Sequence, residues 1–186
     1  MLLHPTHQNF SFESNSISQE HSLKQSEALT LSIGVLGALD VLFTTYILPV
    51  PVWITFTAWA SFFAVGGGKE GLFTSILCNL TGITIASLSL LAASWLGGQS
   101  IAVAICVGIG SAAMVQASKL SFNKGFTPAI VWGFSQTVAA TAAGFALNNP
   151  LTTQATAITA VAMITGAIFG FVSQIWAKSM TTELST

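Results

Sequence analysis

The chain is a series of six apolar segments separated by short gaps, and its five lysines all lie in alternate gaps. The cationic gaps hold Lys24, Lys69, the pair Lys119 and Lys124, and Lys178, and arginine does not occur in the sequence. The other gaps, at 48–53, 96–99 and 148–153, carry turn residues and no lysine. If each apolar segment crosses a bilayer once, every lysine lies on one side, which the positive-inside rule assigns to the cytoplasm.

Composition also favours a membrane protein. Hydrophobic residues make up 52% of the chain and charged residues only 6%, whereas about 25% of the residues of a typical globular domain are charged. A soluble fold could not cover its surface with so few charges. A length of 186 residues is sufficient for about six helices of roughly 20 residues each. We therefore predict an all-α membrane protein, a bundle of six transmembrane helices with both termini in the cytoplasm.

The predicted spans differ in length. They are 28–48, 52–65, 71–96, 101–118, 126–147 and 156–177. Together they form a transmembrane domain at 27–178, between a disordered cytoplasmic tail at 1–26 and a short cytoplasmic tail at 179–186. The second span is at or below the usual lower limit of about 17 residues, so a re-entrant segment is an alternative to a full crossing. A full crossing agrees better with the positions of the lysines.

A faint internal repeat relates the two halves of the chain. The aromatic run Phe56–Phe62 is echoed by Phe126–Phe134, and Thr81-Gly82 is echoed by Thr165-Gly166. Because a unit of three crossings is odd, two copies would lie in opposite orientations, as in the inverted repeats of many transporters. A 3+3 inverted repeat is therefore one interpretation. The alternative is two aromatic-rich helices of similar composition.

Asp40 is the most conspicuous candidate for a functional residue. It lies near the middle of the first span, where an ionised carboxylate costs at least about 2.5–3.5 kcal/mol on insertion scales. Gly34 and Gly37 precede it at intervals of three and share its helix face, which predicts close packing against other helices. Asp40 could serve as a proton or cation site or as a polar anchor for a substrate. The alternative is a protonated side chain that hydrogen-bonds to a neighbouring helix.

Uncharged polar side chains and indoles in other spans are candidates to line a path for a small solute. They are Asn79, Gln116, Gln136, Trp59 and Trp132. The amides could equally tie helices together, because interhelical hydrogen bonds of this kind are worth about 0.6–2 kcal/mol.

Glycines at helical spacing predict the seams along which the spans pack. Gly82 lies in a small, partly polar stripe of the third span, and Gly108 starts a similar stripe in the fourth. Gly166 and Gly170 form a G-x-x-x-G motif in the sixth span, a pattern that lets helix backbones approach closely.

Several function classes are excluded by what the sequence lacks. No basic stripe is present to neutralise phosphates, so nucleic-acid binding is not expected. No Ser-His-Asp set, carboxylate pair or H-E-x-x-H motif occurs, and we expect neither an enzyme nor a bound cofactor. Cys78 and Cys106 lie inside apolar runs, where they suit packing roles. No metal site is expected, because the histidines are irregularly spaced and have no accompanying ligand cluster.

Three blocks of sequence resemble a known family. They are WITFTAWASFFAVGGGKEGL at 53–72, QASKLSF at 116–122 and GFTPAIVWGF at 125–134. Their order is similar to that in the YcdZ-like bacterial inner-membrane proteins, catalogued as domain of unknown function 1097, over about residues 30–178. The resemblance implies a small polytopic protein of the bacterial cytoplasmic membrane. It brings no established substrate or catalytic residue.

The sequence leaves two hypotheses for function. The first is a channel or transporter for a small neutral or cationic solute, formed by a homo-oligomer in the lipid bilayer, with Asp40 and the amides along the path. The second is a membrane scaffold or partner subunit that transports nothing and packs through its Gly/Ala seams. A water-accessible cavity at Asp40 would favour transport, and a dry contact would favour the scaffold.

Overall fold

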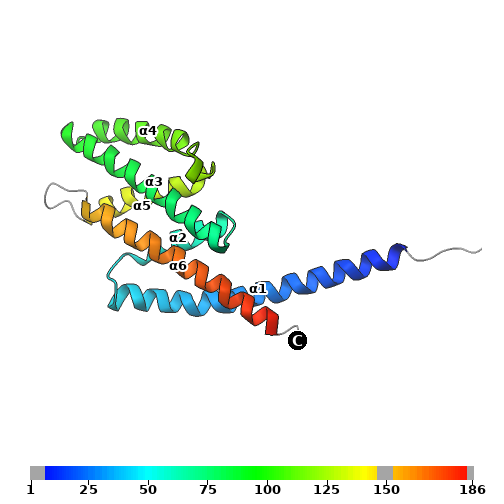
Figure 1. Cartoon of the computed structure of the whole chain (residues 1–186). Helices are drawn as coiled ribbons and strands as arrows, with labels where there is room; N and C mark the ends of the chain where they lie inside the picture. The colour runs from blue at the N-terminus through cyan, green and yellow to red at the C-terminus, as the bar shows by residue number, and fades with distance from the viewer. Residues whose placement is uncertain (1–6, 146–152, 184–186) are drawn as a thin grey trace, which may run out of the picture. The chain divides into compact units, whose positions relative to one another are not determined.

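The computed structural model describes residues 7–145 and 153–183, with side chains at 24–145 and 155–181. In this part of the chain the regular structure is entirely helical, which confirms the all-α prediction. The elements are α1 (His7–Tyr46), α2 (Val52–Ala64), α3 (Gly68–Trp95), α4 (Ser100–Ala117), the 3-10 turn η1 (Ser121–Asn123), α5 (Thr127–Ala142) and α6 (Thr153–Glu183) (Figure 1).

Four helical segments are long and apolar enough to cross a membrane. They are Lys24–Tyr46, Gly68–Trp95, Ser100–Ala117 and Ala155–Thr181. The chain is therefore a membrane protein. Helices α2 and α5 are shorter, with 13 and 16 residues. At a rise of about 1.5 Å per residue they extend about 20 and 24 Å, which is less than the roughly 30 Å of bilayer hydrocarbon.

Helix bounds differ from the predicted spans mainly at the ends of the chain. Helix α1 begins at His7 and so includes much of the predicted tail, whose disorder stays a prediction. Helix α6 continues to Glu183, beyond the predicted end at 177. Helix α5 ends at Ala142, before the predicted end at 147, which lies outside the described residues. Gly144 explains this early end, because its φ of 84° is left-handed and so terminates the helical path.

Backbone contacts divide the chain into two units, residues 1–37 with 173–186 and residues 38–172. This division cuts across the predicted arrangement of tail, bundle and tail, which stays a prediction. In the first unit, the buried residues of α1 are Ala28, Ser32 and Leu36, at intervals of four. On α6, Ser173 and Ala177 are buried with the same spacing. Residues four apart share a helix face, so each helix buries one face of small or aliphatic side chains.

Two turns shape the first half of the second unit. Helix α1 ends where the amides of Ile47 and Leu48 both donate to the carbonyl of Phe43, each at 2.9 Å. Pro49 follows, and its missing N–H prevents continuation of the helix. Between α2 and α3, Gly66, Gly67 and Gly68 have φ values of 104°, 67° and 68°. Only glycine adopts such values without strain, so the triple glycine permits the tight reversal.

Helix α3 is the central element of the second unit, packing most extensively against α5 and then against α4. Backbones meet closely there, since a Cβ at Gly82 would overlap the carbonyl oxygen of Ile130. A Cβ at Gly166 on α6 would likewise overlap the carbonyl oxygen of Thr55 on α2. The outward faces are apolar, with Phe73 66% and Ile101 74% exposed, as expected for surfaces that contact lipid.

Candidate functional site

Asp40 is completely buried, and its carboxyl group is held at the first turn of α2. The hydroxyl of Thr55 lies 2.5 Å from Asp40 Oδ2, and Thr55 is itself completely buried. The hydroxyl of Thr44 donates to the backbone carbonyl of Asp40 at 2.7 Å. Asp40 Oδ1 has no hydrogen-bond partner within the described residues. The carboxyl group is therefore half satisfied, in a chain segment long and apolar enough to cross the membrane.

The contacts of Thr55 are compatible with both protonation states of Asp40. Thr55 Oγ1 lies 2.5 Å from Asp40 Oδ2 and 2.8 Å from the carbonyl oxygen of Val52. A hydroxyl has one proton and can donate it to only one of these acceptors at a time. With Asp40 ionised, the hydroxyl donates to the carboxylate. With Asp40 protonated on Oδ2, the carboxyl donates to Thr55 and the hydroxyl turns to Val52.

A second polar cluster lies farther along α2. Ser61 donates to Asn79 Oδ1 at 3.1 Å, the Ser75 hydroxyl donates to Ser61 Oγ at 3.1 Å, and Asn79 Nδ2 donates to Ser75 Oγ at 3.3 Å. All three side chains are completely buried. These three bonds close a ring, so the cluster ties α2 to α3. Ser61 is six residues after Thr55, which places the two polar groups about 9 Å apart along the helix axis.

The structure brings the candidates for a solute path together only in part. Trp59 on α2 is 3% exposed, and its ring lies 5.9 Å from those of Phe56 and Phe169. It lies between the Asp40 contact and the Asn79 cluster along α2, so these three candidates adjoin one helix. Gln116 lies apart, because it is exposed near the end of α4 and accepts from Lys119 Nζ at 2.8 Å.

The other two candidates for a solute path lie on α5. Trp132 is half-buried and packs against both apolar core clusters of the second unit. Gln136 is half-buried, and its Oε1 atom is buried without a hydrogen-bond partner in the described residues. They are four residues apart and therefore share one face of α5.

The predicted helix-packing glycines divide into two groups. A Cβ at Gly82 or Gly166 would overlap the backbone of a neighbouring helix, and one at Gly170 would crowd the rings of Phe62 and Trp59. Gly34 and Gly108 have no neighbour within 4 Å, and Gly37 is half-buried. On α4 the close contact is instead at Gly110, where a Cβ would overlap Ser89 Oγ.

Several buried polar residues were not among the sequence candidates. Besides Thr55 and Ser61, they include Asn123, which is completely buried in the connection between α4 and α5. Its Nδ2 donates to the carbonyl of Ala117 at 2.9 Å, and its Oδ1 accepts from Thr81 at 3.2 Å. Asn123 thus fixes the end of α4 to α3. No sequence signal indicates this role, because Asn123 lies six residues beyond the end of α4.

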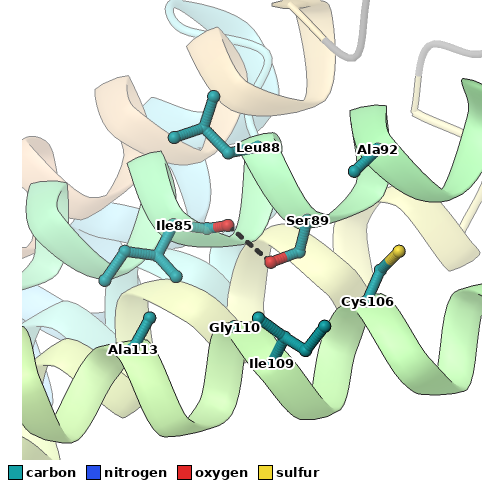
Figure 2. Close-up of a pocket in the computed structure, with 8 residues that line it drawn as sticks. All are labelled: Ile85, Leu88, Ser89, Ala92, Cys106, Ile109, Gly110 and Ala113. Atoms are coloured by element: carbon teal, nitrogen blue, oxygen red, sulfur yellow. Dashed lines mark hydrogen bonds between the residues drawn. The ribbon is translucent and has the colours of Figure 1, made fainter.

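A groove of about 300 Å³ lies between α3 and α4 (Figure 2). Ile85, Leu88, Ser89, Ala92, Cys106, Ile109, Gly110 and Ala113 line it. Ser89 is the only hydroxyl residue among them, and it already donates to the carbonyl of Ile85 at 2.8 Å. Leu88 and Ile109 are 62% and 67% exposed at its rim. Such a groove has no polar group available to orient a solute, and Asp40 does not line it.

Comparison with known proteins identifies a family for this chain but no activity. Searches of curated proteins and of solved structures found no match. A family model described as "Protein of unknown function (DUF1097)" matches residues 30–178. That range contains Asp40 and every other residue singled out above as a candidate. Since the match covers well over half of the sequence, the chain belongs to the DUF1097 family.

Proposed function

We propose that this protein is a channel or transporter for a small neutral or cationic solute in the bacterial cytoplasmic membrane, and that it is not an enzyme. The observation that carries the proposal is the Asp40 carboxyl group, which is completely buried and has one oxygen without a partner in the described residues. Ionisable residues inside membrane spans are costly and commonly mark substrate, ion or proton pathways. The unpartnered oxygen is an acceptor available to a proton, a cation or a solute donor.

Six crossings with cytoplasmic termini form part of this proposal. Lys124 Nζ and Glu70 Oε2 are 3.2 Å apart, so the connection between α2 and α3 adjoins the connection between α4 and α5. These are two of the lysine-bearing gaps, and their adjacency agrees with crossings by α3 and α4 that return the chain to the same side. A full crossing by the 13-residue α2 is part of the proposal and rests on the positions of the lysines. The Pro- and Gly-containing segments at its ends can lie at membrane depth where protein surrounds them.

A 3+3 inverted repeat is the second structural part of the proposal, and burial supports it. With a shift of 84 positions along the chain, each buried residue of α3 corresponds to a residue of α6. Of the ten buried residues of α3, nine have a buried counterpart on α6. The exception is Thr74, whose counterpart Ile158 is half-buried. The same shift pairs Gly82 with Gly166, and a Cβ at either position would overlap the backbone of a neighbouring helix.

Helices α2 and α5 correspond in the same way, with a shift of 75 positions. Five of the six buried residues of α2 then have buried counterparts on α5, and the sixth counterpart, Gln136, is half-buried. Thr55 corresponds to Ile130. Gly82 touches the carbonyl of Ile130, and Gly166 touches the carbonyl of Thr55, so the two contacts correspond. Repeats of this kind place transporter sites at the interface between their halves.

A homo-oligomer is also proposed. Among the four candidate spans, α4 has the least buried window, with 17% buried against 33–39% for the others. Its outward face carries Gly108 and Ala112, both exposed and four residues apart. Small residues at this spacing let a helix of another copy approach closely.

A flux assay in proteoliposomes tests the proposed transport. Wild type, Asp40→Asn and Asp40→Ala are compared over a panel of small neutral and cationic solutes. Asn keeps an acceptor for Thr55 but cannot change its protonation state, so we expect it to fold and to lose at least tenfold in flux. Glu70→Gln is the matched control, because this carboxylate is 90% exposed. Two results would contradict the proposal. One is that Asp40→Asn transports a solute as fast as the wild type does, and the other is that the wild type transports none of the solutes.

The scaffold is the second candidate function, and the Thr55 contact favours it. A carboxyl group bonded to a hydroxyl of the adjacent helix can act as a structural tie, and the groove of Figure 2 is not at Asp40. This alternative predicts a stoichiometric partner on mild purification and no flux. A clean homo-oligomer would argue against it.

A further inference from the structure

Two other buried polar atoms lack partners, and they lie on α5 and α6. Gln136 Oε1 and Thr159 Oγ1 make no hydrogen bond to any residue that the structure describes. Thr159 is completely buried. Buried polar atoms in native proteins are almost always paired, with water or a ligand where protein supplies no partner. Each of these atoms is therefore open to a partner that the described residues do not supply.

The helical register places both groups in one interface. Gln136 lies between Trp132 and Ala140 at intervals of four along α5, and Thr159 lies between Ala155 and Met163 with the same spacing along α6. These four flanking residues belong to, or pack against, one apolar core cluster. Residues four apart share a helix face, so Gln136 and Thr159 both face this cluster, to which α5 and α6 both contribute.

The proposed repeat explains why this pair is open. With the shifts of 75 and 84 positions, Gln136 corresponds to Ser61 and Thr159 corresponds to Ser75. Ser61 and Ser75 are bonded at 3.1 Å, and Asn79 completes their ring of hydrogen bonds. The counterpart of Asn79 is Met163. A thioether donates no hydrogen bond and is only a weak acceptor, so the second ring lacks its closing member.

We propose that Gln136 and Thr159 form a binding site for a small uncharged molecule with both donor and acceptor groups, of the size of water or urea. Such a molecule would donate to Gln136 Oε1 and exchange a hydrogen bond with the Thr159 hydroxyl, so that it takes the place of the Asn79 amide in the other half. Ala140, Ala155 and Ala162 are all completely buried in the cluster that Gln136 and Thr159 face, and this close packing leaves room for a small molecule only. The site deepens the proposed transport function, because it selects an uncharged solute.

Thr159→Val tests the site in the full-length protein, since valine keeps the shape and removes the hydroxyl. Thr137→Val is the matched control, because Thr137 is equally buried but already donates to the carbonyl of Gly133 at 2.9 Å. Stopped-flow light scattering measures osmotic water permeability and urea permeability of proteoliposomes. We expect Thr159→Val to lower one of the two permeabilities by about fivefold, the effect of losing one ordinary hydrogen bond, and Thr137→Val to leave both unchanged. The permeability that falls identifies water or urea as the occupant.

Thermal unfolding of the same variants in detergent separates this site from the transport proposal. If a bound molecule satisfies the hydroxyl, Thr159→Val lowers the midpoint by more than Thr137→Val does. If the hydroxyl is unpaired, its removal raises the midpoint, and that result overturns the site whatever the flux. A lowered midpoint in a protein without any flux supports the site and counts against transport alone. The reverse result is that flux depends on Asp40, while Thr159→Val keeps the wild-type flux and has a raised midpoint. That result counts against the site and leaves the transport proposal in place.

Discussion

Gly166→Ala is the sharpest test of the packing in the second unit. The new Cβ would overlap the carbonyl oxygen of Thr55, and it would also come too close to the Cα and carbonyl carbon of that residue. Backbone atoms cannot move aside like the end of a side chain, so α2 and α6 must separate. Overpacking of this kind costs about 1–3 kcal/mol. Alanine regains up to about 1 kcal/mol of helix propensity, so we expect a net loss of about 1–2 kcal/mol.

The control for this substitution is Gly34→Ala. Gly34 is also inside a helix, but nothing lies within 4 Å of the position of its Cβ. Only the propensity term then remains, and we expect unchanged or slightly increased stability. The assay is reversible unfolding of the purified protein in mixed micelles, followed by circular dichroism. If Gly166→Ala is as stable as Gly34→Ala, the close contact between α2 and α6 is wrong. Gly82→Ala should behave like Gly166→Ala, because it meets the backbone of Ile130.

Three further predictions concern other parts of the second unit. In the same unfolding assay, Lys124→Gly should either leave the stability unchanged or raise it by up to about 1 kcal/mol. The reason is that Lys124 has a φ of 49°, a left-handed conformation that is unfavourable for any residue with a Cβ. Ser61→Ala should destabilise by about 1 kcal/mol in that assay, because it leaves Asn79 Oδ1 buried without its donor. The topology can be tested with single cysteines in a variant that lacks the native cysteines. Gln99→Cys should react with an impermeant maleimide added outside cells, whereas Ser121→Cys should react only after the membrane is opened. If both cysteines react from the same side, the proposed topology is excluded.

Helix positions could be predicted closely from the sequence because apolar runs and turn residues are both local signals. The predicted span 71–96 corresponds to α3 at Gly68–Trp95, and the predicted span 101–118 corresponds to α4 at Ser100–Ala117. The ends of the chain were harder. Hydropathy reports where a helix can enter lipid, and it does not report how far the helix continues beyond its apolar part, as α1 and α6 both do.

The rotation of each helix about its own axis could not be predicted as well. On α4 the sequence indicated Gly108, whereas the close contact is at Gly110, on nearly the opposite face. In a soluble helix the hydrophobic face would decide between the two. In a membrane, lipid is as apolar as the protein core, so an apolar helix gives no such signal. On α3 the mixture of serine, asparagine and glycine did mark one face, and Ser75, Asn79 and Gly82 are all buried.

The candidate site was predictable in its first member and not in its partners. Asp40 stood out because a carboxylate in an apolar segment is expensive. Thr55 did not stand out, since threonine is common in membrane helices and commonly satisfies itself on its own backbone. Its contact with Asp40 depends on how the connection at 47–51 turns the chain, so that the start of α2 meets the last turns of α1. That geometry is set by tertiary packing, to which a single sequence gives little access.

One hydrogen bond offsets most of the cost of burying Asp40 and leaves its second carboxyl oxygen open within the described residues. Ionised Asp40 costs about 2.5–3.5 kcal/mol to insert, and a hydrogen bond to a charged group returns about 1.5–3 kcal/mol. The first turn of α2 contributes about 0.3–1 kcal/mol more, as the positive end of a helix dipole does for a nearby anion. These terms nearly balance, so the contacts of Asp40 with Thr55 and with the start of α2 offset most of the cost of burying a charged carboxyl group. A purely structural tie would gain more from satisfying both oxygens, because a buried acceptor without a partner loses its hydration and gains nothing in return. Asp40 Oδ1 stays without a partner in the described residues, and that acceptor is what asparagine at position 40 cannot reproduce in both states.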